Sequence, residues 1–176
     1  MSALARLYTV QQLPAGKVSI MPHPRGGDWL SDEMKALFIE GVDVLVSLLT
    51  PEEVAELDLQ HEATVCQGQG IVYLSYPILD LNVPPFSADT FALLEALKAY
   101  LAQGKHIAVH CWMGFGRSAL IAASVLVLSG YTPERACKVL SVERGSNVPE
   151  MEEQRAWVRA LAQRYQEHLR TQDDAL

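Results

Sequence analysis

The sequence predicts an α/β layer fold with buried central strands, and three observations lead to this prediction. Short apolar runs rich in β-branched residues, which are typical of buried strands, alternate with helix-like segments up to about residue 117. From there onward the pattern is helical only. No linker or internal repeat interrupts the chain, so the 176 residues are expected to form a single domain, residues 1–176.

In the N-terminal half, capping residues and β-branched runs mark the elements. Ser31 and Thr50 each come shortly before acidic residues, a pattern typical of helix N-termini, and Pro51 suits a first helical position. The run 42–49 (VDVLVSLL) predicts a buried strand between these two helices. The expected elements are one or two strands within residues 1–30 with a turn at 25–27, a helix over 31–41, a strand over 42–49, a short helix over 50–57 and a strand over 71–79.

In the C-terminal half, helical patterns dominate. Ser87 precedes an amphipathic stretch whose apolar residues, three or four positions apart, share one helical face. Thr132 precedes a proline and marks another helix start. The expected elements are a loop at 82–85, a helix over 87–104, a short buried strand over 105–110 and three helices over 117–129, 133–143 and 149–170.

Composition and charge narrow the functional classes. A net charge of −7 argues against nucleic acid as a partner, because binding to its phosphates needs clustered lysines and arginines. The three cysteines are irregularly spaced and fit neither a disulfide framework nor a metal site. The first ten residues lack the long apolar core of a signal peptide, and the longest apolar run, 119–128, is too short to insert stably in a membrane. We expect a cytoplasmic protein; its oligomeric state is not predicted.

Residues 110–118 (HCWMGFGRS) are the most informative segment, because they join an apolar strand to an apolar helix. Cys111 is followed by five residues and then Arg117, so a thiol, a glycine-bearing turn, a guanidinium and a helix N-terminus meet in one place. Each of these groups favours a bound oxyanion. Together they predict a thiolate that attacks the phosphorus of a phosphate ester.

Other residues of the segment suit the same chemistry. Gly114 and Gly116 allow the loop to curl its N–H groups around one anion, which requires unusual dihedrals and close backbone approach. Arg117 can hold two phosphate oxygens with its planar fork of donors. Ser118 can donate a hydrogen bond to the sulfur and make it a better leaving group. The predicted phosphate-binding residues are Trp112, Met113, Gly114, Phe115, Gly116 and Arg117.

The segment HCWMGFGRS resembles the signature of the cysteine-dependent protein tyrosine phosphatase superfamily, in its compact dual-specificity branch. Residues 76–80, with the paired prolines after them, resemble the general-acid segment of dual-specificity and phosphoinositide phosphatases, and residues 144–155 resemble their C-terminal segment. The similarity spans about residues 30–165. It implies a central mixed, mostly parallel sheet flanked by helices, with C-terminal helices on one side, and catalysis without a metal or other cofactor.

A departing alkoxide or phenoxide must be protonated, so the proposed chemistry needs a general acid. Asp80 is the predicted acid, since it follows a strand in a proline-rich loop 31 positions before Cys111, a spacing similar to that of the family. It would later act as a base for the water that attacks the cysteinyl-phosphate. The alternative for Asp80 is a turn-forming residue beside Asn82, and the alternative acid is Asp89, which also suits the first turn of a helix.

The resemblance implies supporting roles for further residues. His110 would support the loop and the low pKa of the catalytic thiol rather than transfer a proton. Gln154 would orient the hydrolytic water, although on sequence alone it is a surface helix residue. Some family members form a protective disulfide with the catalytic cysteine, which makes Cys66 a candidate partner for Cys111; a free Cys66 thiol is the alternative. Cys137 is expected in the core.

The expected substrate is a phosphorylated protein. The five residues between Cys111 and Arg117 are uncharged, which favours a monophosphate on an aryl or protein side chain over a polyphosphorylated ligand. Phosphotyrosine is therefore predicted, with phosphoserine and phosphothreonine as further substrates. The alternatives are a phosphoinositide or inositol-phosphate phosphatase, a non-catalytic module that binds phosphoproteins, and a sulfur-transfer or redox enzyme built on a cysteine loop.

Overall fold

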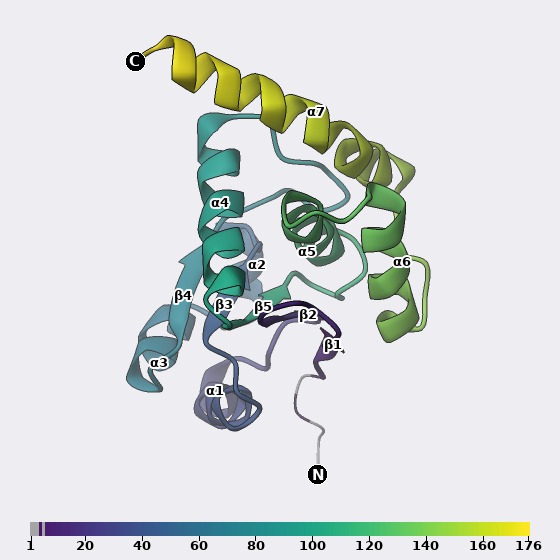
Figure 1. The fold of residues 1–176 in the computed structure, drawn as a ribbon. Helices are drawn as coiled ribbons and strands as arrows, with labels where there is room; N and C mark the ends of the chain where they lie inside the picture. The colour runs from purple at the N-terminus through teal and green to yellow at the C-terminus, as the bar shows by residue number, and fades with distance from the viewer. Residues whose placement is uncertain (1–3, 5) are drawn as a thin grey trace.

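The computed structural model describes residue 4 and residues 6–176, and its centre is a five-stranded mixed sheet with helices on both faces (Figure 1). The strand order is β1-β2-β5-β3-β4; β1 is antiparallel to β2, and the other neighbouring strands are parallel. The predicted α/β class and mostly parallel sheet are thus confirmed. The strands are β1 (Tyr8–Val10), β2 (Lys17–Met21), β3 (Val44–Ser47), β4 (Val72–Ser75) and β5 (His106–His110).

Helices α4, α5 and α6 cover one face of the sheet, with α7 packed against α5 and α6, and α1 and α3 cover the other face (Figure 1). Helix α5 contacts α4, α6 and α7, which confirms that the C-terminal helices pack on one side. No helix within the described residues is both long and apolar enough to cross a membrane. The helices are α1 (Leu30–Ile39), α2 (Pro51–Glu56), α3 (Glu62–Gly68), α4 (Ala88–Ala102), α5 (Arg117–Leu128), α6 (Pro133–Arg144) and α7 (Glu152–Asp174), with a 3₁₀ turn, Gly27–Trp29, before α1.

Strand β5 is buried on both faces, and this fixes the position of the segment that follows it. Ile107 and Val109 belong to the core that contains α4 and α5, whereas Ala108 belongs to the core under α1 and α3. Successive side chains of a strand point to opposite faces, so a strand between two helical layers must be apolar throughout. The end of β5 is therefore held between β2 and β3.

Three of the four predicted helix caps are confirmed. The side chains of Thr50, Ser87 and Thr132 each accept a backbone N–H in the first turn of their helix. The prediction for Ser31 is wrong, because α1 begins at Leu30 and Ser31 lies inside the helix. The 3₁₀ turn leads directly into α1, so this helix begins without a capping side chain.

Two elements have different bounds from those predicted. Strand β4 ends at Ser75 rather than near residue 79, since Pro77 lacks the N–H that a strand ladder uses. Helix α7 begins at Glu152 rather than at residue 149. The backbone N–H of Glu150 donates to the carbonyl of Phe115 at 2.9 Å, so residues 149–151 lie against the nucleophile segment as a loop.

Helix α3 was not predicted. Its N-cap residue, His61, makes no side-chain cap, so the usual start signal is missing. The helix is held by the burial of Glu62 and Cys66 against the rest of the protein. Because this stabilisation comes from tertiary contacts, the local sequence pattern does not show it.

Candidate active site

The predicted nucleophile segment lies at the carboxyl edge of the parallel strands. Strand β5 ends at His110, residues 111–116 form a loop, and α5 begins at Arg117 with Gly116 as its N-cap. In open α/β sheets this edge is where ligands bind. The N-terminus of α5, 12 residues long, adds a partial positive charge there. The fold therefore presents the loop as a cradle for an anion.

Cys111 sits at the bottom of the loop with two polar neighbours. Its Sγ accepts a hydrogen bond from the backbone N of Gly114 at 3.3 Å and lies 3.3 Å from Oγ of Ser118. The residue is only 3% exposed. In the structure the thiol donates to the Ser118 hydroxyl, and the same hydroxyl can donate to the sulfur of a thiolate. The structure thus brings together three of the residues that the sequence predicted.

A side chain would be excluded at Gly114 and crowded at Gly116. Gly114 has φ +80°, and a Cβ there would lie 2.9 Å from the carbonyl carbon of Met21. Gly116 has an ordinary φ of −116°, but a Cβ there would lie 3.0 Å from the amide group of Gln154. The prediction of unusual dihedrals holds for Gly114, and that of close approach holds for both.

Arg117 is buried and its guanidinium is bound by a residue that the sequence analysis did not identify. Nη1 donates to Oε2 of Glu53 and Nη2 to Oε1, both at 2.8 Å, and Nη1 also donates to the carbonyl of Ile78 at 2.9 Å. Glu53 closes a capping box with Thr50 at the start of α2, and Thr50-x-x-Glu53 was the available signal. Because the capping box alone accounts for a glutamate at this position, the contact of its carboxylate with Arg117 was not predicted.

The charges of this pair stabilise each other. Burial by itself would raise the pKa of Glu53, but hydrogen bonds from Arg117 and Thr50 outweigh it and hold that pKa below its ordinary value. Burial works against the charge of Arg117 as well, yet the hydrogen bonds to Glu53 and the charge of Cys111 raise its pKa. Nε of Arg117 is buried and donates to no atom of the described residues. This leaves Nε and the outer edge of Nη2 as donors for an oxyanion.

Asp80 lies at the mouth of the same site. Its Oδ1 is 3.3 Å from Nη2 of Arg117, and the side chain is 63% exposed. The same oxygen accepts from the backbone N of Leu81 at 2.9 Å, and Asn82 donates to the Asp80 carbonyl at 2.8 Å. Both interpretations of Asp80 are therefore visible, since it forms the turn and also faces the arginine. The alternative acid, Asp89, is exposed in the first turn of α4.

The loop that carries Asp80 is anchored to α7 and α4. Nε1 of Trp157 donates to the carbonyl of Pro84 at 2.8 Å, and its ring stacks on Phe86 with the centroids 4.5 Å apart. Tyr76 and Thr90 share a hydrogen bond at the other end of the loop. Between these anchors the loop exposes apolar side chains, and Met113 of the nucleophile loop is exposed too. The exposed apolar residues are Leu79, Leu81, Val83 and Met113.

The remaining side chains of the nucleophile loop point away from the sulfur. Trp112 packs against the core under α1 and α3 and lies edge-on to His23. Phe115 lies under the guanidinium of Arg144, 3.8 Å from its carbon to the ring centroid. Arg144 also donates to the carbonyls of Gly114 at 3.1 Å and Met113 at 3.2 Å. It thus binds the outward carbonyls while the N–H of Gly114 turns toward the sulfur.

Gln154 is fully buried, so its assignment to the helix surface is wrong. Its Oε1 accepts from the backbone N of Met151 at 3.2 Å, and its Nε2 lies 3.4 Å from the carbonyl of Asn82. The amide group therefore lies between Gly116 and the loop that carries Asp80. Residues 149–151, which form a loop rather than the first turn of α7, bring it there.

His110, whose supporting role stays a prediction, lies next to the loop at the end of β5. It is fully buried, and its Nε2 lies 2.6 Å from Oε1 of Glu62, which is also fully buried. Cys66 lies elsewhere, with its Sγ against Sδ of Met34, and burial raises the pKa of its thiol to about 12. The structure thus places Cys66 against Met34 as a buried free thiol, and Cys137 is half-buried against the core.

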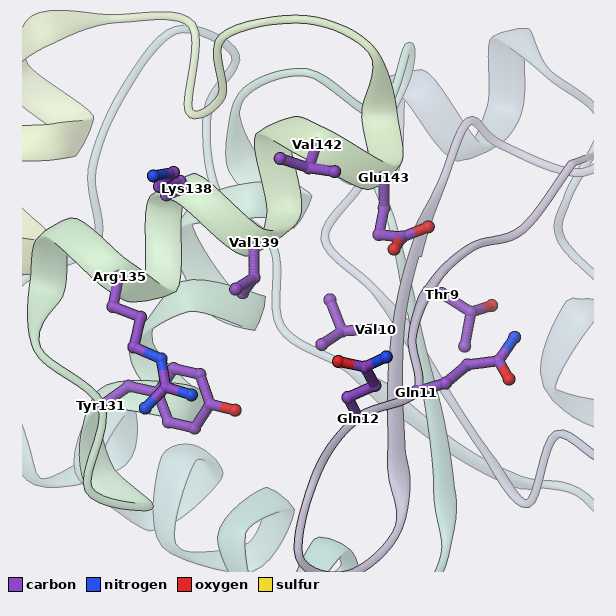
Figure 2. Close-up of a pocket in the computed structure, with 10 residues that line it drawn as sticks. All are labelled: Thr9, Val10, Gln11, Gln12, Tyr131, Arg135, Lys138, Val139, Val142 and Glu143. Carbon is purple, nitrogen blue, oxygen red and sulfur yellow. The ribbon is translucent and has the colours of Figure 1, made fainter.

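The largest cavity described lies away from this site. It is a groove of about 650 Å³ between β1 and α6, and Figure 2 shows the 10 residues that line it, among them Gln12, Tyr131 and Arg135. None of these ten is a predicted site residue. Among the described residues, no three His, Cys, Asp or Glu side chains gather where they could hold a metal ion. Catalysis without a metal stays a prediction.

Comparisons with known proteins relate this site to a family. Residues 20–131 match the family model described as "Polymorphic toxin system, DSP-PTPase phosphatase" (Tc-R-P). The chain is 27% identical over 145 residues to cyclin-dependent kinase inhibitor 3 of Homo sapiens, covering 81% of this chain and 66% of that protein. It is 32% identical over 89 residues to protein tyrosine phosphatase type IVA 3 of Mus musculus, covering 49% of this chain and 51% of that protein.

A solved structure shares the whole fold. It is kinase associated phosphatase (KAP) with its catalytic site cysteine replaced by serine, similar with a TM-score of 0.81 at 20% identity over 92% of this chain and 98% of that one. The chain spans between about half and two thirds of the length of the curated relatives it matches. At this level of identity the solved structure shows that the fold is common to both.

We expect Glu53→Gln to destabilise the protein by about 2–4 kcal/mol at pH 7, because the buried guanidinium of Arg117 loses its charged partner. Urea unfolding measures this loss. Since the pKa of Glu53 is lowered in the folded state, the difference from the wild type is fully present above its ordinary value of 4.5 and shrinks as pH falls through the lowered value. The control is Glu52→Gln, an exposed neighbour in the same turn, which should change stability by less than about 0.5 kcal/mol. Equal effects of the two substitutions would contradict the assignment.

Proposed function

We propose, from the premise that this chain belongs to the DSP-PTPase family of cysteine-dependent phosphatases, that it hydrolyses phosphate monoesters on proteins through a cysteinyl-phosphate intermediate. The observation that carries the proposal is the environment of one sulfur atom. Sγ of Cys111 receives the N–H of Gly114 and lies beside the hydroxyl of Ser118, at the N-terminus of α5. A thiolate held there faces the position where the loop would bind a phosphoryl group.

In the first half-reaction the Cys111 thiolate attacks phosphorus, the S–P bond forms and the P–O bond to the leaving group breaks. Arg117 and the loop N–H groups stabilise the charge on the equatorial oxygens. Protonated Asp80 transfers its proton to the departing oxygen. The 3.3 Å separation between Asp80 and Arg117 supports this role, because it places the carboxyl group beside the oxyanion donors.

In the second half-reaction water attacks phosphorus, the P–S bond breaks and inorganic phosphate leaves. Asp80, now ionised, removes a proton from the attacking water. Gln154 is the proposed residue that orients this water, since its buried amide lies between Gly116 and the acid loop. The Ser118 hydroxyl, which lies 3.3 Å from Sγ and accepts from the thiol in the structure, can donate to the departing sulfur once it is a thiolate, and this lowers the energy of the thiolate as it forms.

The proposed substrate is phosphotyrosine in a protein, with phosphoserine and phosphothreonine as further substrates. The nucleophile loop contributes no charged side chain between Cys111 and Arg117. The exposed side chains of Leu79, Leu81 and Met113 provide an apolar rim, which suits a protein substrate with an aryl group better than a polyanion. We further propose the cytoplasm as the location, because the mechanism needs a reduced thiol and all three cysteines are free.

The primary test is turnover of a phosphotyrosyl peptide in the presence of a chelator. We expect inorganic phosphate to be released by the wild type, and Cys111→Ser to abolish turnover because a serine hydroxyl is not ionised at this site. A Cys137→Ser variant is the matched control and should retain full activity. Turnover that survives Cys111→Ser, or that the chelator removes, would rule out the proposed mechanism.

The role of Asp80 is tested by changing the leaving group. We expect Asp80→Asn to lower kcat about 10²–10⁴-fold on phosphotyrosine, because the phenoxide must then leave unprotonated. The loss should shrink on aryl phosphates with more acidic phenols, because these leaving groups need less protonation. Asp89→Asn should behave like the wild type on every substrate. The assignment fails if the loss is independent of the leaving group.

A substrate panel tests the proposed class. Rates are compared for one peptide carrying phosphotyrosine, phosphoserine or phosphothreonine and for short-chain phosphatidylinositol phosphates. We expect phosphotyrosine to give the highest kcat/KM, since the apolar rim and the uncharged loop favour an aryl monophosphate. A higher kcat/KM on the lipids than on all three peptides would instead favour the phosphoinositide alternative.

A further inference from the structure

A buried carboxylate lies directly behind the nucleophile loop. Oε1 of Glu62, in the first turn of α3, is 2.6 Å from Nε2 of His110, the last residue of β5. Both side chains are completely buried. This pair joins the helix that the sequence pattern did not predict to the residue immediately before Cys111. Neither capping nor core packing requires an acidic residue at this position.

The hydrogen bonds of His110 indicate its protonation state. Nδ1 lies 3.3 Å from the carbonyl oxygen of Cys111, and Nε2 faces the carboxylate of Glu62. A carbonyl oxygen can only accept a hydrogen bond, and so can an ionised carboxylate. Neutral imidazole has one N–H, whereas imidazolium has two. Beside an ionised Glu62, the ring can therefore satisfy both neighbours only as imidazolium.

The other titratable groups that face Glu62 are neutral at physiological pH. The hydroxyl of Tyr73, on β4, lies 3.5 Å from Oε2, and Cys66 comes from the next turn of α3. Burial, and then the charge of Glu62, raise the pKa of Tyr73 to about 12 and that of Cys66 also to about 12. Within the described part of the chain, His110 is thus the group that can offset the charge of Glu62.

The energy of an unpaired buried charge makes the pairing strong. A carboxylate without a partner in the interior costs several kcal/mol, so ionised Glu62 favours the charged ring of His110. The ring lies between Glu62 and the Cys111 backbone, so its positive charge is closer to the loop than the negative charge is. A cation behind the loop favours an anion within it.

We infer that Glu62 is a positioning residue that holds His110 as imidazolium behind the nucleophile loop and thereby favours the thiolate of Cys111. The inference rests on the proposed function, in which this thiolate attacks phosphorus. It adds a second charged pair to the site. Glu53 positions the cation that binds phosphate, and Glu62 supports the cation that favours the nucleophile.

The first test measures the pH dependence of Cys111 alkylation by iodoacetamide, followed by mass spectrometry of the Cys111 peptide. Glu62→Gln keeps the shape of the side chain but removes its charge. In this variant the midpoint pH of Cys111 alkylation should rise by about one unit, which corresponds to a tenfold drop in alkylation rate at pH values below the midpoint. The acid limb of kcat/KM should shift equally. Glu62→Asp keeps the charge and should restore most of the shift.

The control is Cys66→Ala, which removes another buried group beside Glu62 and leaves the charged pair intact. A purely structural role of Glu62 would lower stability, or lower the rate equally at every pH, without moving the midpoint. An unchanged midpoint in Glu62→Gln therefore overturns the inference. Alkylation of Cys111 does not require turnover of a substrate. A wild-type protein without phosphatase activity would therefore overturn the proposed function, while the midpoint pH of alkylation would still test the role of Glu62.

A second measurement needs no folded Glu62 variant. In wild-type protein labelled with ¹⁵N-histidine, the ring nitrogens of His110 should both carry a proton at pH 7.5, whereas an exposed histidine would be neutral. The signal is assigned by its loss in His110→Asn. A neutral His110 ring at this pH would overturn the inference even if Glu62→Gln failed to fold.

Discussion

The bidentate pair between Arg117 and Glu53 is the interaction on which the site depends. Through its guanidinium, Arg117 at the start of α5 contacts α2, the carbonyl of Ile78 and the carboxylate of Asp80. Three segments that are distant in sequence therefore meet at one buried cation. Because a buried charge must be paired, the fold can tolerate this cation only while all three segments are in place. The same contacts hold the loop that carries Asp80 beside Arg117.

In the loop of residues 111–116, a backbone N–H and two backbone carbonyl groups point in opposite directions. The N–H of Gly114 points to sulfur, whereas the carbonyls of Met113 and Gly114 accept from Arg144. A loop that turned carbonyl oxygens toward the anion would repel it. Arg144 stabilises the opposite arrangement, and it does so from α6, so the last turn of that helix contributes to the electrostatics of the pocket although it touches no reacting atom.

Most of the fold and the centre of the site could be predicted from the sequence, because their signals are local. The order of strand, glycine-bearing loop and helix around Cys111 follows from adjacent residues. Thr50 and Ser87 mark the starts of their helices because their own side chains cap them. Glu53, Glu62 and the burial of Gln154 could not be predicted, because each depends on a partner more than 35 positions away. An acidic residue in a helical segment looks solvated until the fold places a cation beside it.

The hydrogen bond from Trp157 to Pro84 has a consequence for how the chain can vary. The four buried residues of α7 form a single stripe spaced as one face of a helix: Gln154, Trp157, Val158 and Leu161. The first two of them contact the loop that carries Asp80. Substitutions at Gln154 or Trp157 would therefore disturb the loop that carries Asp80. Further along the helix, Tyr165 contacts Glu95 and His168 stacks on Phe91, so α4 holds the middle of α7 in place and separates its exposed last turn from that loop.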